Sequence, residues 1–200
     1  MNLQYLGDAL DHWKGSMFQT LQAEDVLRGF SVDAMASDAT AWRPTDRKLF
    51  ARLLRIEESQ VVHHDHDLCH ERERYFEEIP SKGDLFLDPD TGVMTGAVTR
   101  VEQYLRPDEL FSAIESEKDR VVVVYQHVRA QKTRVRVEQV LDILRKQKQK
   151  FSCASYESGT VALLFCSQED KRIVSVRDCF QGLLGSHANN RIGYWNCRAV

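Results

Sequence analysis

The stretch Asp84-Leu85-Phe86-Leu87-Asp88-Pro89-Asp90-Thr91-Gly92 decides the fold that we expect. Its three apolar residues predict a short buried strand, and Asp-Pro-Asp-x-Gly after them is favourable turn chemistry. Ligands bind outside the carboxyl ends of strands in open α/β sheets, and a buried carboxylate there needs an ion, a metal or hydrogen bonds. We therefore predict a catalytic crevice at Asp88, Pro89 and Asp90. The simpler interpretation is that Asp88 caps the turn.

Two further strand ends carry polar residues. Asp33 follows the apolar run Phe30–Val32, and His127 follows the run Val121–Tyr125. If these strands are parallel, their polar side chains lie with Asp88 at the same edge of the sheet. A histidine beside two carboxylates can act as a general base, and the carboxylates can instead hold a divalent ion. In the alternative interpretation, His127 hydrogen-bonds a loop.

Helical and strand patterns alternate along the chain, which predicts an α/β fold with a mostly parallel sheet. Only three residues separate Phe151–Tyr156 from Thr160–Ser167, too few for a crossover helix, so these runs predict a C-terminal antiparallel hairpin. We expect a single domain over residues 1–185 and a surface tail over residues 186–200. The other predicted elements are helices at 2–14 and 16–28 with a break near Gly15, further helices at 46–56, 66–79, 107–117 and 177–184, and strands at 30–34, 84–88, 121–125 and 172–176.

The composition is that of an ordinary globular protein. Of 200 residues, 42% are hydrophobic and 28% are charged. No apolar run approaches the roughly 18 residues that a membrane-spanning helix needs, and the start of the chain lacks a secretory-signal pattern. The five cysteines are scattered without a CxxC pair, which favours neither a disulfide framework nor a zinc ribbon. We therefore expect a cytoplasmic protein without a membrane partner.

Charge is distributed unevenly along the chain. Residues 1–120 carry 14 basic and 24 acidic side chains, whereas residues 121–200 carry 13 basic and 6 acidic ones. The basic excess is concentrated in Arg129–Lys150, which holds eight Lys or Arg residues against two acids. Such a stretch can contact a nucleic-acid backbone. The alternative is the solvated face of an amphipathic helix.

The run from His63 to His70 has the composition of a metal site. His66 and His70 are one helical turn apart, as zinc ligands on a helix can be. However, no distant Cys or His pair completes a tetrahedral set, and the run continues into the polar sequence Glu-Arg-Glu-Arg. A solvated helix start is therefore the interpretation that we adopt, and we assign no metal site. The sequence also lacks a Walker loop, a nucleophile elbow and a G-x-G-x-x-G fingerprint.

The spacing Gly7-Asp8-x-x-Asp11-x-x-Lys14 resembles the G-N-x-x-D-x-x-K-H element that opens the large-subunit ribosomal RNA adenine methyltransferases. The order of later elements is similar too: a strand ending in Asp, a strand ending in Asp-Pro, a Val-rich strand and a closing hairpin. The resemblance implies a Rossmann-like methyltransferase-type fold that binds S-adenosylmethionine. It implies a catalytic turn at Asp88 and Pro89. The residues that it implies near the cofactor and substrate are Gly7, Asp8, Asp11, Lys14 and Asp33.

The chain departs from the pattern of that family in three places. Ala-Met-Ala-Ser follows Asp33, where the family has glycines that let the backbone approach the cofactor. Asp90-Thr91 replaces the Pro-Tyr pair whose ring stacks on a flipped base. Gly15 follows Lys14, where the family has a histidine. These changes indicate that cofactor binding is altered or lost.

Together these features predict a methyltransferase-like nucleic-acid-processing protein. A first alternative is a nuclease in which Asp88 and Asp90 hold Mg²⁺ or Mn²⁺, which would activate a water molecule. A second alternative is a non-catalytic module that binds nucleic acid or protein. In the versions that bind nucleic acid, Arg129–Lys150 is the predicted contact.

Overall fold

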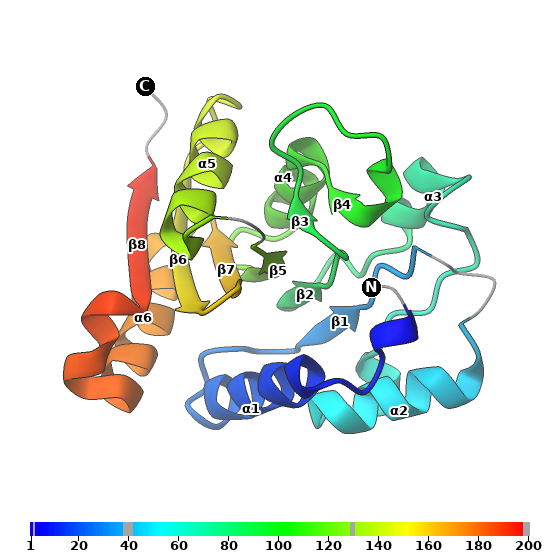
Figure 1. Cartoon of the computed structure of the whole chain (residues 1–200), viewed down its shortest axis with the longest axis horizontal. Helices are drawn as coiled ribbons and strands as arrows, with labels where there is room; N and C mark the ends of the chain where they lie inside the picture. The colour runs from blue at the N-terminus through cyan, green and yellow to red at the C-terminus, as the bar shows by residue number, and fades with distance from the viewer. Residues whose placement is uncertain (2, 38–41, 129–130, 198–200) are drawn as a thin grey trace.

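A six-stranded mixed sheet forms the centre of the molecule (Figure 1). Residues 1, 3–37, 42–128 and 131–197 are described in this computed structural model. The strand order is β1-β2-β5-β7-β6-β8, in which β1, β2 and β5 are mutually parallel and each later pair is antiparallel. The strands are β1 (Ser31–Asp33), β2 (Leu85–Leu87), β5 (Val122–His127), β6 (Phe151–Ser158), β7 (Val161–Ser167) and β8 (Ile192–Cys197). The predicted α/β class, with parallel central strands and a closing antiparallel hairpin, is confirmed.

Helices cover both faces of this sheet, with α1, α2 and α6 on one face and α4 and α5 on the other (Figure 1). Side chains alternate between the two faces of a strand, so the sheet has one hydrophobic core on each face. Phe86 and Val123 pack against α1, whereas Leu87 and Val124 face α4 and α5. The helices are α1 (Ala9–Ala23), α2 (Pro44–Leu54), α3 (Arg72–Glu77), α4 (Pro107–Glu115), α5 (Thr133–Arg145) and α6 (Asp170–Leu184).

Shorter elements connect these layers. A small parallel sheet, β3 with β4, follows the Asp-Pro-Asp turn and lies beside β5. Residue Val61 forms an isolated parallel bridge to Val32 of β1. No helix within the described ranges is long and apolar enough to cross a membrane. These elements are η1 (Leu3–Tyr5), η3 (Glu58–Gln60), β3 (Gly92–Val93), η4 (Val101–Gln103), β4 (Tyr104–Leu105) and η5 (Gly185–Asn190).

The break predicted near Gly15 is wrong, because α1 continues through it from Ala9 to Ala23. Gly15 does not turn the chain but lets α1 pack closely against α2. A Cβ atom at this position would lie 2.3 Å from the carbonyl oxygen of Leu53 in α2, so only glycine lets the two helices approach this closely. Asp8 starts the helix by accepting hydrogen bonds from the backbone N–H groups of Leu10 and Asp11.

The end of the chain differs from the prediction in two ways. The strand predicted at 172–176 is wrong, since α6 spans Asp170–Leu184 and buries Ile173, Val176 and Phe180 at helical spacing. The surface tail predicted from residue 186 is also wrong for Ile192–Cys197. This segment is β8, which pairs antiparallel with β6 along its whole length. The segment becomes a strand here because the edge of β6 supplies its hydrogen bonds.

Candidate functional site

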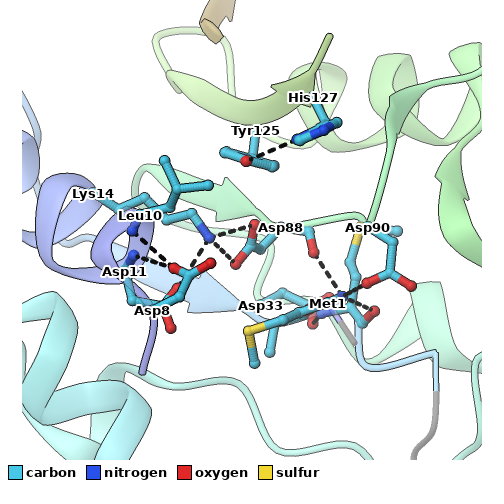
Figure 2. Close-up of polar contacts among 12 residues, drawn as sticks. Met1, Asp8, Leu10, Asp11, Lys14, Asp33, Asp88, Asp90, Tyr125 and His127 are labelled. Carbon is cyan, nitrogen blue, oxygen red and sulfur yellow. Dashed lines mark hydrogen bonds and ion pairs between the residues drawn. The ribbon is translucent and has the colours of Figure 1, made fainter. Parts of the chain in front are cut away.

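A cavity of about 250 Å³ lies at the carboxyl ends of β2 and β5, against the start of α1 (Figure 2). Residues before and at the start of α1, and residues of the turn after β2, line it. Seven of the residues that the sequence singles out line it, together with Met1, Tyr5, Leu10 and Tyr125. The seven are Asp8, Asp11, Lys14, Asp88, Pro89, Asp90 and His127.

Lys14 and Asp88 form a buried ion pair at the base of this cavity. The Lys14 Nζ atom donates to both carboxylate oxygens of Asp88, at 3.0 and 2.8 Å, and to Asp11 Oδ1 at 3.2 Å. Burial alone would lower the pKa of Lys14, but Asp88 and Asp11 outweigh it and raise that pKa. Burial raises the pKa of Asp88, and Lys14 offsets part of this rise. The contact of Lys14 with both Asp88 oxygens has the geometry of an ammonium paired with a carboxylate.

The start of α1 is built so that Lys14 points inward. Gly7 has φ of +94°, a conformation that favours glycine, and its N–H donates to Asp11 Oδ2 at 2.9 Å. Asp8 caps the helix, so Asp8 and Asp11 stand on the first turn beside the cavity. Lys14, three residues after Asp11, lies on the same side of the helix. The four residues that resemble the family element therefore lie together at the site.

The α-amino group of Met1 lies on the other side of Asp88. Its nitrogen is 2.7 Å from the carbonyl oxygen of Ala34, 2.6 Å from that of Met35 and 2.8 Å from that of Asp88. The Asp90 carboxylate lies 3.3 Å from the same nitrogen and accepts a hydrogen bond from Ser37 Oγ. Asp88 and Asp90 are thus each paired with an ammonium group (Figure 2).

Aromatic side chains form the remaining wall. The ring of Tyr125 lies under Lys14, with the Nζ atom 4.4 Å from the ring centroid, which is a cation–π contact. The Tyr125 hydroxyl is 3.4 Å from His127 Nδ1 (Figure 2). Tyr5 is 58% exposed although it lines the cavity, so its ring stands at the entrance. Sequence reasoning missed both tyrosines, although Tyr125 shares a strand face with Val123 and could have been placed from that alternation.

Gln126, the first polar residue after the run Val121–Tyr125, fixes the shape of the turn after β2. Its side-chain amide donates to the carbonyl oxygen of Thr91 and accepts from the N–H of Val93. It fills the space beside Gly92, where a Cβ atom would lie within 2.4 Å of it. Gly92 has φ of +116°, which further restricts this position to glycine. The Asp-Pro-Asp turn is therefore held by β5 as well as by its own residues.

Asp33 lies outside this cavity, in a separate cluster after β1. Its Oδ1 atom accepts from the Tyr75 hydroxyl and from the N–H of Met35, and its Oδ2 lies 3.2 Å from His64 Nε2. Although burial would raise the pKa of Asp33, His64 and Tyr75 lower it. His64 also contacts Glu78 at 3.2 Å and stacks on the Tyr75 ring at 3.6 Å. A smaller cavity of about 120 Å³ lies beside this cluster.

The histidine run forms carboxylate pairs. His66 pairs with Glu78 at 2.6 Å, and His70, which is 82% exposed in its side chain, pairs with Asp67 at 3.3 Å. Within the described parts of the chain, no group of three or more His, Cys, Asp or Glu side chains is arranged to hold a metal ion.

The basic stretch is divided between two ends of the sheet. Arg134 pairs with Glu157 at 2.9 Å, and Arg136 donates to the carbonyl oxygen of Val93, so both contact the protein itself. The second half of the stretch follows the end of α5, which runs back to the amino edge of the sheet before β6. The exposed basic residues there are Arg145, Lys146, Lys148 and Lys150. Arg129, the first residue of the stretch, lies outside the described residues.

Comparisons with known proteins give a distant structural likeness. No family model matches the chain, and no curated protein matches it. Among solved structures, protein LPL1258 from Legionella pneumophila str. Philadelphia 1, family-model DUF519, is similar at 14% sequence identity with a TM-score of 0.40. The match covers 83% of this chain and 58% of that one, so this chain spans less than two thirds of the length of that protein.

Proposed function

We propose that this chain is a methyltransferase-like protein whose cavity at the ends of β2 and β5 binds S-adenosylmethionine. The observation that carries the proposal is the buried contact between Lys14 and Asp88. The resemblance needs these residues at one site although they are 74 positions apart, and their charged atoms lie 2.8 Å from each other. The parallel strands β1, β2 and β5, followed by an antiparallel hairpin, support the methyltransferase-type version of the fold.

The charge of the cavity favours a small cation. The carboxylates of Asp8, Asp11, Asp88 and Asp90 face it, against the two ammonium groups of Lys14 and Met1. Carboxylates in partly buried surroundings attract a cation and repel a phosphate. Aromatic faces in the wall add to the attraction. S-adenosylmethionine carries a sulfonium and an ammonium against one carboxylate, so its net charge complements this cavity.

The exposed ring of Tyr5 supports a base as the second substrate. The turn lacks an aromatic residue at Asp90-Thr91, whereas Tyr5 presents a ring at the entrance of the same cavity. A flipped base binds by stacking on such rings and by hydrogen bonds from its edge. Asp88 offers carboxylate oxygens and His127 a ring nitrogen toward an amino group on that edge. The cofactor, when bound, supplies the methyl group.

The metal-dependent nuclease receives less support from this geometry. Both oxygens of Asp88 accept from Lys14, and the Asp90 oxygens accept from Ser37 and lie beside the Met1 nitrogen. A divalent ion held by these two carboxylates would have to displace two ammonium groups. The Lys14 Nζ atom thus supplies, in this cavity, the positive charge that a metal would supply in a nuclease.

Calorimetry tests the cofactor assignment. The measurement uses S-adenosylmethionine and S-adenosylhomocysteine, which lacks the sulfonium charge. It is made on the chain itself and on a form with one glycine ahead of Met1, because the α-amino group occupies part of the cavity wall.

We expect S-adenosylmethionine to bind several-fold more tightly than S-adenosylhomocysteine, since the carboxylates favour the extra charge. We expect Asp88→Asn to weaken binding and the exposed control Asp142→Asn to leave it unchanged. No detectable heat with about 1 mM ligand in both forms would overturn the assignment, because a useful site should show a dissociation constant below this.

A further inference from the structure

Two of the five cysteines meet in the antiparallel hairpin of the sheet. Cys153 of β6 lies directly opposite Cys166 of β7 in the register of the two strands, which run side by side in Figure 1. The Cys166 thiol donates to the Cys153 sulfur, and the two Sγ atoms are 3.5 Å apart. All five cysteines are free thiols. The fold thus joins two thiols whose spacing in the sequence follows no disulfide or zinc motif.

The register places this pair within reach of a disulfide bond. Residues directly opposite in an antiparallel pair have Cα atoms about 4.5 or 5.5 Å apart, and disulfides span about 4.4 to 6.8 Å between Cα atoms. Both side chains belong to the core on the α4 and α5 face of the sheet, so they point the same way. The sulfurs have to approach from 3.5 Å to about 2.0 Å, a change that side-chain rotation can supply.

Cys197 is near this pair but outside its reach. It belongs to the same core and lies opposite Phe151 of β6, whereas Cys153 lies opposite Trp195 of β8. Cys197 and Cys153 are therefore diagonal neighbours, whose Cα atoms are typically about 7 to 8 Å apart. That spacing exceeds the range that a disulfide bridges without backbone movement. Cys197 is thus a matched control for the burial and position of the pair.

The pair is closed to solvent in the folded sheet. Both cysteines are 0% exposed, and the hydrogen bond from Cys166 together with burial raises the pKa of Cys153 well above its ordinary value. The reactive thiolate is therefore scarce while the sheet is closed. The strand β8 forms the edge of the sheet beside β6, and its Trp195 is the direct neighbour of Cys153. Because edge elements open locally at a lower free energy than the core, we expect release of β8 to expose Cys153 before Cys166.

We propose that Cys153 and Cys166 are a thiol pair that a low-molecular-weight disulfide oxidises reversibly to a disulfide bond between β6 and β7. In the first step, the Cys153 thiolate attacks one sulfur of the oxidant, breaks its S–S bond and releases one thiolate. In the second step, the Cys166 thiolate attacks the Cys153 sulfur of the mixed disulfide and releases the other thiolate. The protons of the two cysteines end on the two released thiols, so the protein loses two electrons and the oxidant gains two.

Such a bond would couple the stability of the sheet to the surrounding redox state. It would join residues 13 positions apart across the turn at Gly159, and a disulfide stabilises a fold chiefly by restricting the unfolded chain. Disulfides that form in reducing compartments are typically transient and redox-sensing. Neither cysteine lines the cavity at Lys14 and Asp88, so the pair is independent of the cofactor assignment.

The experiment incubates the folded chain for several hours near pH 8 in mixtures of reduced and oxidised glutathione. The remaining thiols are blocked with N-ethylmaleimide in urea and counted by mass spectrometry. We expect the chain to lose two of its five free thiols as the oxidised form comes into excess, and dithiothreitol to restore them. Cleavage after Glu157, which separates the two cysteines in the sequence, should leave their two fragments joined until reduction.

The variants Cys153→Ser and Cys166→Ser should each abolish this bond, whereas the control Cys197→Ser should leave it unchanged. The proposal is overturned if the folded chain keeps all five thiols in excess oxidised glutathione, carries only bound glutathione, or bonds another pair. The same mixture of pairings in the folded chain as in urea would also overturn it, because the register would then not select the partner. The unmodified chain alone gives each of these results, so a variant that does not fold leaves the test intact.

Discussion

At the scale of single residues, the site depends on buried charges that satisfy one another. Lys14 is 4% exposed and Asp88 is 1% exposed, so water stabilises neither charge. Each is stabilised by its partner and by the neighbouring Asp11 or Met1 nitrogen. A buried pair of this kind contributes little net stability compared with apolar residues, but losing one partner leaves an uncompensated charge. The pair is therefore better explained by the site that it forms than by stability.

Replacing Lys14 by methionine should destabilise the protein by about 3–5 kcal/mol, because Asp88 and Asp11 would keep their buried negative charges. Urea unfolding followed by circular dichroism measures the change. The exposed ion pair of Arg28 with Asp25 is the control, and Arg28→Gln should cost at most about 1 kcal/mol. The double variant Lys14→Met with Asp88→Leu should recover part of the stability. If the double variant is as unstable as the single one, the buried charge is not the cause.

His64 makes stability depend on pH. Burial opposes its positive form, but Asp33 and Glu78 outweigh burial and raise the pKa of His64 above its ordinary value. The unfolded chain binds this proton less strongly, so the stabilisation is complete below the ordinary pKa of about 6.5 and disappears as pH rises through the higher folded value. We expect the melting temperature to fall over this range. In His64→Gln the same fall should be smaller, and an identical pH profile in the two proteins would contradict the assignment.

At the scale of the elements, close packing of α1 against α2 positions Lys14 in the site. Gly15 lets the α1 backbone approach Leu53 and Leu54, and Lys14, the preceding residue, then reaches Asp88. On the other side, Gln126 ties the turn after β2 to β5. The turn and the helix are therefore each positioned by a residue that carries no chemistry of its own.

Gly15→Ala should destabilise the protein by about 1–3 kcal/mol, because the new methyl group would collide with the α2 backbone and this cost exceeds the gain in helix propensity of about 1 kcal/mol. Gly182 in α6 is the matched control. A Cβ atom there meets nothing within 4 Å, so Gly182→Ala should stabilise the protein by up to about 1 kcal/mol. Thermal and urea unfolding of both variants measure the difference. Equal effects of the two changes would show that packing against α2 is not limiting.

At the scale of the whole molecule, the cavity and the exposed basic cluster lie at opposite edges of the sheet. The carboxylates gather where β2 and β5 end, whereas Arg145–Lys150 lies where β6 begins. A nucleic acid that contacted this cluster would be held away from the cavity unless it spanned the sheet. Binding through phosphates and chemistry in the cavity are therefore separable properties.

If the basic cluster binds nucleic acid, affinity for a single-stranded RNA should fall steeply as salt rises. Replacing Lys146, Lys148 and Lys150 by glutamine should weaken binding and reduce the slope of log affinity against log salt by about 0.7 for each phosphate that is no longer neutralised. Filter binding at several salt concentrations measures both. The same changes should leave the affinity for S-adenosylmethionine unchanged. Binding that does not depend on salt would exclude this role of the cluster.

Several parts of the fold and site could be predicted from local sequence. The run Leu85–Leu87 is a strand as predicted, whereas the helix predicted from residue 2 begins at Ala9. The strand predicted at 172–176 failed because Ile173 and Val176 fit both a short strand and one face of a helix. The tail prediction failed because Ile192–Cys197 owes its strand conformation to the edge of β6, a segment far from it in the sequence.

By itself, the sequence determined the alternation of helices and strands and the residue types at the strand ends, because both follow from hydrophobic period and turn chemistry over a few neighbouring positions. Only the tertiary structure decided which charges meet. It paired Lys14 with Asp88, placed Asp33 with His64 in a separate cluster, and enclosed the Met1 nitrogen between two strand ends. The physical reason is that an ion pair forms in a low-dielectric interior wherever packing brings opposite charges together, and distance along the chain carries no information about that packing.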